Sequence, residues 1–144
     1  MSEPIAIIAQ KFSEIVIPLV NAAQKSIRII VYDWRFYPSV DGSSVSQFNA
    51  AIVAAAKRGV QVQALVNSDS VISILKQKGI EARRVHSART LHTKMLLIDD
   101  TNLVIGSHNY TQNAFALNHE ASIFVPLLLV DNAFTQYFDN LWGV

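Results

Sequence analysis

Residues 92–109 read HTKMLLIDDTNLVIGSHN. Two aliphatic runs, 95–98 and 102–105, flank a short polar segment, and this arrangement predicts an antiparallel β-hairpin. The polar residues follow the pattern H-x-K-x4-D-x6-G-S-x-N, which fixes six positions in eighteen residues. An ordinary strand that happens to carry a histidine and a lysine is the simplest alternative, but it leaves the other four positions unexplained. The stretch therefore predicts a hairpin that carries a chemical site.

The loop of this hairpin sets its register. With a two-residue loop, Asp100-Thr101, Asp99 pairs with Asn102. Continuing that pairing brings four polar side chains to one face of the hairpin: His92, Lys94, Ser107 and Asn109. Asp99 then points to the opposite face, where we expect it to hold loops or backbone N–H groups. A three-residue loop would shift the register by one and move Ser107 and Asn109 to the other face.

The four converging groups suit a phosphodiester. A lysine ammonium and an asparagine amide bind non-bridging phosphate oxygens, and an imidazole acts as a nucleophile or proton donor. No acidic pair stands beside them, as a two-metal nuclease requires. A metal site built on His108, His119 and Glu120 is the alternative, although it matches no zinc-binding pattern. We expect no bound metal, and we assign His86 and His108 to loops.

The composition indicates one globular domain over residues 1–144. Hydrophobic residues make up 51% and charged residues 16% of the chain, which excludes a disordered protein. The absence of cysteine excludes disulfides, cysteine-bound zinc and a thiol nucleophile. The first residues lack the pattern of a signal peptide, and the longest apolar stretch, 123–130, is too short to span a bilayer. We expect a soluble cytoplasmic protein without stable membrane association.

Positive charge gathers just before the motif, although the net charge of the chain is only +1. Residues 76–94 carry one acidic side chain, Glu81, and these basic ones: Lys76, Lys78, Arg83, Arg84, Arg89 and Lys94. Such a segment attracts a phosphate-bearing polymer, whereas a solvated helix face and loop is the alternative interpretation. We expect Arg84 and Arg89 to bind substrate together with Lys94 and Asn109.

Strands and helices alternate along the first half of the chain. Strands are expected at 5–9, 27–32, 60–66 and 82–85, with helices ending near 24–25, 57–59 and 78–79. Pro18 leaves the start of the first helix open, because proline is tolerated only in the first turn. Pro38 and Asp41-Gly42 mark a loop, and the expected helix caps are Ser44, Ser68 or Ser70, and Asp131. With a strand at 121–125 and a helix at 132–141, this order predicts an α/β fold with a mixed, largely parallel sheet flanked by helices.

The motif also identifies a family resemblance. H-x-K-x4-D-x6-G-S-x-N is similar to the signature of the phospholipase D superfamily, and the segments 26–32, 55–62 and 118–120 extend the resemblance over most of the chain. The resemblance implies an α/β/α sandwich and phosphodiesterase activity without a cofactor. Most members carry two copies of the motif, whereas this chain carries one. It therefore resembles the small bacterial nucleases in which two identical subunits build one active site.

The resemblance implies roles for the matching residues. His92 is similar to the histidine that attacks phosphorus or, in the other subunit, protonates the leaving oxygen. Lys94 and Asn109 match the pair that binds phosphate. Ser107 matches the serine that orients its neighbours, and Glu120 matches an acid that contacts the histidine. The missing cysteine separates this chain from the zinc-bearing relatives of small-RNA pathways.

We predict a metal-independent phosphodiesterase, a low-specificity endonuclease that cleaves DNA or RNA through a phosphohistidine. This route needs one histidine to attack and a second to protonate the leaving group, and no histidine other than His92 is followed by a lysine two residues on. A second copy must then supply the other histidine, which predicts a homodimer. A phospholipase D-type lipid phosphodiesterase and a nucleic-acid-binding accessory module without turnover are the alternatives. Asn67 stands where many relatives carry aspartate, and this departure affects the expected rim of the site.

Overall fold

The computed structural model of the chain describes residues 3–37, 42–130 and 132–143. Within these ranges seven strands form one sheet in the order β1-β7-β6-β5-β2-β3-β4. The strands are β1 (Ile5–Ile8), β2 (Ser26–Ile30), β3 (Gln61–Val66), β4 (Glu81–Arg84), β5 (Met95–Ile98), β6 (Asn102–Gly106) and β7 (Ala121–Pro126). The α-helices of the same ranges are α1 (Phe12–Asn21), α2 (Ser44–Lys57), α3 (Asp69–Gln77) and α4 (Ala133–Trp142). Short helical turns lie at Ala9–Lys11, Asn113–Leu117 and Leu127–Leu129.

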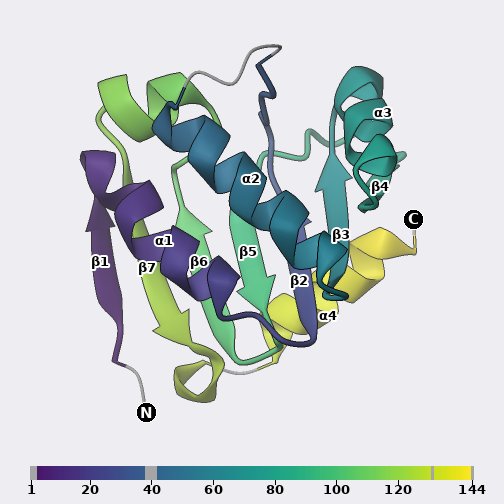
Figure 1. Ribbon diagram of the computed structural model, residues 1–144. Coiled ribbons are helices and arrows are strands. Elements are labelled where there is room, and N and C mark those ends of the chain that lie inside the picture. Colours follow the sequence, from purple (N-terminus) through teal and green to yellow (C-terminus); the bar gives the residue numbers. More distant parts are fainter. Residues whose placement is uncertain (1–2, 38–41, 131, 144) are drawn as a thin grey trace.

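Helices cover both faces of the sheet (Figure 1). On one face α1, α2 and α3 enclose the larger apolar core, in which Phe12, Phe48 and Leu75 are fully or almost fully buried. On the other face α4 encloses a smaller core through Phe138, which meets side chains such as Leu97. Helices thus bury both faces of the central strands, as their continuous apolar sequences require, whereas β1 and β7 each carry exposed as well as buried residues. The predicted α/β fold with flanking helices is confirmed.

The sheet is mixed, as predicted, but its parallel part is smaller than we expected. β2 pairs in parallel with β3, and β3 with β4. The pairs β2–β5, β5–β6, β6–β7 and β7–β1 are antiparallel. The reason lies in the connections, because α2 and α3 are crossover helices that return the chain in the same direction. The chain between β5 and β6 is far too short for a crossover.

The predicted register of the hairpin is wrong by one residue. The loop comprises the three residues 99–101, so that Ile98 pairs with Asn102. The first two loop residues, Asp99 and Asp100, have positive φ angles of 56° and 54°. Aspartate tolerates this left-handed conformation better than most residues, which lets the chain reverse without glycine. The strand ladder therefore does not place Ser107 opposite Lys94.

The helix boundaries agree with the sequence except in three details. The first helix, α1, ends at Asn21, three residues before the predicted end near 24–25. Pro18 lies inside α1. The helical hydrogen bonding continues past this proline, since the Ala22 N–H donates to the Pro18 carbonyl at 3.1 Å. α2 is capped by Ser43 rather than by Ser44, with the Ser43 hydroxyl accepting the N–H of residue 46 at 3.3 Å. Ser68 caps α3, as one of the two predicted alternatives. Local propensity thus locates the ends of α2 and α3 to within about one residue, but not the end of α1.

Three residues of the predicted loops and caps, Pro38, Asp41 and Asp131, lie outside the described residues. The helix that Asp131 is expected to cap, α4, begins at Ala133. Across the described ranges, none of the helices combines the length and the apolar character needed to cross a membrane.

Candidate active site

Except for Asp99, the motif residues gather at one end of the sheet, in or next to the segments that join neighbouring strands. β2 and β6 end there, and β5 and β7 begin there, because the pairs that join them are antiparallel. The segments carry Tyr32 after β2, His92 and Lys94 before β5, Ser107 and Asn109 after β6, and Glu120 before β7. The parallel strand β3 also ends here, and ligand sites of α/β sheets commonly lie outside such carboxyl ends. The site is therefore formed by loops, and not by one face of the hairpin as we predicted.

The exposed ring of His92 meets Lys94 and Tyr32. Lys94 Nζ lies 3.0 Å from Nδ1 and 3.3 Å from Nε2 of His92. The Tyr32 ring packs against the imidazole with 4.7 Å between ring centroids, and Lys94 Nζ lies 5.5 Å from the Tyr32 centroid. Sequence reasoning missed Tyr32, although its place directly after a buried strand was a usable signal. The three side chains together present an imidazole, an ammonium and an aromatic ring.

Lys94 is partly withdrawn from solvent. Burial lowers the pKa of Lys94 below its usual value of 10.5, and the nearby Glu120 carboxylate opposes this shift. No ion pair within 4.0 Å holds Nζ in the part of the chain that the structure describes. A partly desolvated ammonium without a carboxylate partner is suited to bind an anion such as phosphate.

Glu120 is held by two polar neighbours. The Ser107 hydroxyl donates to Glu120 Oε1 at 2.5 Å, and Asn118 Nδ2 donates to Oε2 at 3.1 Å. Ser107 Oγ also accepts the Ala121 N–H at 3.0 Å, so that both the serine and the carboxylate are fixed at the start of β7. The resemblance implies a contact between Glu120 and His92, but no hydrogen bond joins these two among the described residues. Ser107 thus orients Glu120, and Glu120 acts on Lys94 through its charge.

Asn109 connects the end of β6 to the segment after β2. Its Oδ1 accepts the Asp33 N–H at 3.1 Å. The Tyr110 N–H donates to the Asp33 carbonyl at 3.0 Å, and the Arg35 N–H donates to the Tyr110 carbonyl at 3.0 Å. With Oδ1 held, the amide has one orientation, and Nδ2 has no hydrogen-bond partner among the residues described. Asn109 therefore offers a fixed N–H donor to an anion.

Gly106 and His108 are structural members of the motif segment. Gly106 pairs with Ser122, and a Cβ at Gly106 would overlap the backbone and side chain of Ser122. His108 is 1% exposed, and its Nε2 donates to the Ala9 carbonyl at 2.8 Å while its Nδ1 accepts from the Ser122 hydroxyl at 2.7 Å. Burial lowers the pKa of His108 below 6.5. The hydrogen bond to the Ala9 carbonyl and the charge of Glu120 act in the opposite direction but are outweighed. His108 lies in the segment after β6, as the predicted loop residue, and it anchors that segment in the core.

Both ring nitrogens of His108 are thus engaged within the protein, which removes it from the metal site that the sequence left open. In the described ranges, no three His, Cys, Asp or Glu side chains are grouped to hold a metal ion.

Asp99, the acid of the motif, lies at the other end of β5 from His92. Its carboxylate accepts the backbone N–H groups of Gln24, Lys25 and Ser26 at distances from 2.7 to 3.1 Å. Burial raises the pKa of Asp99, but these hydrogen bonds and the charge of Lys25 outweigh it and bring the pKa below 3.8. The prediction of a structural carboxylate that holds backbone N–H groups is confirmed. Asp99 reaches these N–H groups because it lies in the hairpin loop, and not because its side chain points to a particular face of the strand.

Asn67 follows β3 and joins two of the site segments. Its Nδ2 donates to the Tyr32 carbonyl at 3.1 Å and to the Leu91 carbonyl at 2.9 Å. One amide therefore fixes the backbone at Tyr32 and the backbone just before His92. An aspartate has no N–H to donate in its ionised form, so the departure from the family pattern has a structural role.

The basic side chains of 76–94 do not form one surface. Arg83 turns toward α4, where its guanidinium donates to the Trp142 carbonyl at 2.8 Å and lies over the Trp142 ring. Arg84 turns toward α3 and pairs with Asp69 at 3.4 Å, because neighbouring strand residues face opposite sides. Arg84 lies at the carboxyl end of β4, and Arg89 is exposed in the loop that leads to His92. These two arginines are thus the members of the run nearest the site end of the sheet, besides Lys94.

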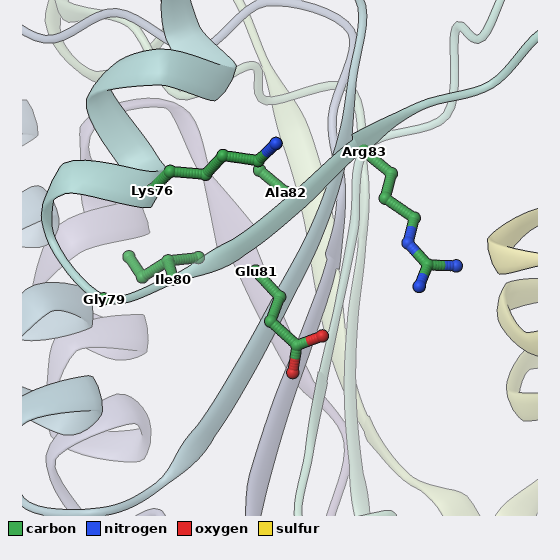
Figure 2. A pocket seen from close by; sticks show the side chains of 6 residues that line it. All are labelled: Lys76, Gly79, Ile80, Glu81, Ala82 and Arg83. Atoms are coloured by element: carbon green, nitrogen blue, oxygen red, sulfur yellow. The ribbon is translucent and has the colours of Figure 1, made fainter.

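A hollow at the opposite end of β4 lacks a comparable set of groups (Figure 2). Its lining consists of Lys76, Gly79, Ile80, Glu81, Ala82 and Arg83. In Figure 2 Lys76 extends from α3 toward β4, whereas Glu81 and Arg83 extend from β4 toward the other side, and the charged ends of the three side chains lie apart. This hollow therefore does not compete with the His92 end of the sheet as a site for chemistry.

Comparison with known proteins identifies the family. The family model described as "Cardiolipin synthase, PLD-like domain" matches residues 16–142. The chain belongs to the phospholipase D-like family. Among curated relatives, the mitochondrial cardiolipin hydrolase of Xenopus tropicalis is 26% identical over 137 residues, which cover 91% of this chain and 60% of that protein. This phospholipase D-like chain thus spans less than two thirds of the length of that relative.

Solved structures share the fold of this phospholipase D-like chain. NucT from Helicobacter pylori has a TM-score of 0.80 at 18% identity, covering 98% of this chain and 96% of that one. Nuc from Salmonella typhimurium, a phospholipase D family member, has a TM-score of 0.78 at 23% identity, covering 98% and 95%. These likenesses confirm the seven-stranded mixed sheet with flanking helices. The chain thus shares both the phospholipase D-like family and the fold of these solved structures.

Proposed function

We propose that this chain is a metal-independent phosphodiesterase that cleaves nucleic acid through a phosphohistidine, with one active site shared by two copies. The observation that carries the proposal is the placement of Lys94 Nζ 3.0 Å from the exposed ring of His92. A phosphate oxygen bound by the Lys94 ammonium brings phosphorus next to a ring nitrogen of His92. Asn109 Nδ2 supplies a second, fixed donor to the phosphate.

The chemistry proceeds in two steps. A ring nitrogen of His92 attacks phosphorus and forms an N–P bond, while the P–O bond to the leaving group breaks and that oxygen takes a proton from a second histidine. Water then attacks phosphorus and gives a proton back to the second histidine, while the N–P bond breaks and releases a phosphomonoester. Lys94 and Asn109 offset the charge on the non-bridging oxygens in both steps. Both histidines end in their starting state.

The second histidine comes from a second copy of the chain. His108 is buried with both nitrogens engaged, so it takes no part in proton transfer. His86 and His119 are exposed but have no lysine two residues on, as His92 has. A two-fold axis through the phosphate would bring two His92–Lys94 sets to one phosphorus atom. The monomer is then inactive.

Nucleic acid is the favoured substrate because Arg84 and Arg89 lie beside the same end of the sheet. Positive charge at the end of the sheet that carries Lys94 attracts a polymer with a phosphate at every residue, although the Asp69 carboxylate offsets the charge of Arg84. Lipid is the second candidate, since the curated relatives are named cardiolipin hydrolases. A phosphodiester in cardiolipin presents the same reacting group to His92.

Parallel assays in excess EDTA test the activity. The substrates are single- and double-stranded DNA, RNA, cardiolipin vesicles and bis(p-nitrophenyl) phosphate. We expect nucleic acid to be cleaved by the wild type and a loss of at least ~10²-fold in His92→Ala, the range of one positioned acid–base group. His119→Ala is the matched control and should keep its activity. Loss of cleavage in EDTA would contradict the metal-free route, and cleavage of cardiolipin alone would favour the lipid candidate.

Subunit mixing tests the shared site. After exchange of equal amounts of wild type and His92→Ala, a site that needs both copies retains roughly one quarter of the wild-type activity at the same total protein. Independent monomers would retain roughly one half. A loss in His119→Ala as large as in His92→Ala would also contradict the shared site, because it would identify a second histidine within the same chain.

A further inference from the structure

A hollow of about 310 Å³ lies beside His92 at the carboxyl ends of β2 and β3. Its polar lining consists of Tyr32, Asp33, Arg35, Asn67, Ser68 and Ser70. Tyr32 joins the hollow to the site, because the same ring packs 4.7 Å from the imidazole of His92. A substituent on a phosphorus atom held at His92 and Lys94 is therefore within reach of this hollow. We propose that it is the subsite for the nucleoside attached to the reacting phosphate, an inference that rests on the proposed phosphodiesterase function.

The charge of the lining favours a neutral polar group. Arg35 Nε donates to Asp33 Oδ1 at 2.8 Å, and this carboxylate raises the pKa of Arg35 through the hydrogen bond and its charge. The pair leaves the hollow without net charge, in contrast to the positive charge of Lys94 beside it. A phosphate is therefore favoured at Lys94, and an uncharged substituent is favoured in the hollow.

The remaining groups match the edges and the face of a base. Tyr32 is 42% exposed and offers an aromatic surface, on which bases of any sequence stack. Asn67 uses Nδ2 for the two backbone carbonyls, which leaves Oδ1 as an acceptor, and Ser70 adds a hydroxyl that lies 2.8 Å from the Ser68 hydroxyl. The volume is at the lower end of the roughly 300–1,000 Å³ of small-molecule sites, and a lipid with two acyl chains needs a larger and more apolar space.

Two esters with the same leaving group test the subsite. Thymidine 5′-(p-nitrophenyl phosphate) and methyl p-nitrophenyl phosphate differ only in the substituent that remains on phosphorus. We expect kcat/KM to be about tenfold higher for the thymidine ester, which is the size of one base–aromatic stacking contact. Ser70→Phe, which fills the hollow from the exposed first turn of α3, should bring this ratio close to one by lowering kcat/KM for the thymidine ester. Ser73→Phe on the same helix does not line the hollow and should keep the wild-type ratio.

Other outcomes overturn the inference. A wild-type ratio near one, or an unchanged ratio in Ser70→Phe, would show that the hollow does not take the nucleoside. Preference for glyceryl p-nitrophenyl phosphate over the thymidine ester, abolished by Ser70→Phe, would reassign the hollow to a polyol such as a lipid headgroup. If no ester is cleaved, the proposed function fails, and thymidine 5′-monophosphate binding by calorimetry still decides the subsite. Tighter binding than inorganic phosphate, weakened about tenfold in Ser70→Phe but not in Ser73→Phe, supports it; equal binding contradicts it.

Discussion

Replacement of Asp99 by alanine should unfold the protein more readily without altering its chemistry. The carboxylate accepts three backbone N–H groups, those of Gln24, Lys25 and Ser26. Each net hydrogen bond contributes about 1 kcal/mol, so the three contribute about 3 kcal/mol. Alanine at a φ of 56° adds a left-handed penalty of about 1–2 kcal/mol. We therefore expect Asp99→Ala to lower the free energy of unfolding by about 4–5 kcal/mol.

Asp100→Ala is the matched control. Asp100 has nearly the same backbone conformation, with φ 54°, in the same loop, but its side chain makes only an ion pair with Arg28 at 3.4 Å among the described contacts. Partly exposed ion pairs contribute little, so this variant should lose about 1–2 kcal/mol, chiefly from the left-handed backbone. The difference between the two variants isolates the three hydrogen bonds. Asp99→Asn keeps one carbonyl oxygen and tolerates the left-handed backbone, so it should show the smallest loss in the free energy of unfolding of the three variants.

Urea unfolding at fixed m-value measures these differences. The pKa of Asp99 in the folded protein lies below 3.8, so its contribution is complete above that pH and is lost as the pH falls through the folded pKa. The gap between wild type and Asp99→Ala should therefore narrow in acid toward the left-handed penalty of about 1–2 kcal/mol. A gap between Asp99→Ala and Asp100→Ala below about 1 kcal/mol at neutral pH would refute the structural role. So would a folded Asp99→Asn protein whose turnover is lost, since Asp99 lies away from His92.

Three further substitutions test the residues that hold the site segments in place. Gly106→Ala places a Cβ against Ser122 and should lower the free energy of unfolding by about 1–3 kcal/mol, whereas Gly143→Ala, with no neighbour closer than 3.8 Å, should be nearly neutral in the same urea titration. Because the pKa of His108 is lowered, its neutral form stabilises the fold fully above pH 6.5, and this contribution is lost as the pH falls. The free energy of unfolding should therefore fall less steeply with decreasing pH in His108→Gln than in the wild type. Asn67→Asp removes both hydrogen bonds of Nδ2 and should lower thermal stability and reduce kcat roughly tenfold by releasing the segment before His92. An unchanged kcat in a folded Asn67→Asp protein would contradict that positioning role.

Periodicity and capping chemistry predicted most of the elements, because these signals act over a few residues. The strands on both sides of the motif and the ends of α2 and α3 follow from aliphatic runs, serine caps and glycine stops within the local sequence. The chemical content of the site followed from residue type and spacing. His92, Lys94, Ser107 and Glu120 do lie at one end of the sheet.

The register of the hairpin could not be predicted, because it depends on contacts far away in the chain. A loop containing two left-handed aspartates is held by the backbone of residues 24–26, and Asp99 is 75 positions from Gln24. The burial of His108 has a similar cause, since its partner Ala9 is 99 positions away. Tyr32 lies against His92 only because β2 and β5 pair, which no local pattern shows. Long-range pairing decided these points, and single-sequence reasoning lacks access to it.

The spacing between Lys94 and Asp99 in the motif corresponds to the length of strand β5. The four residues between Lys94 and Asp99 are β5, which spans about 13 Å at 3.3 Å per residue. Asp99 joins one end of that strand to residues 24–26, and Lys94 reaches the reacting end. An insertion or deletion of one residue within β5 would therefore detach the chain from its anchor or turn Lys94 to the other side of the sheet. Mutational tolerance in this stretch should be high for one aliphatic residue in place of another and close to zero for any change in length.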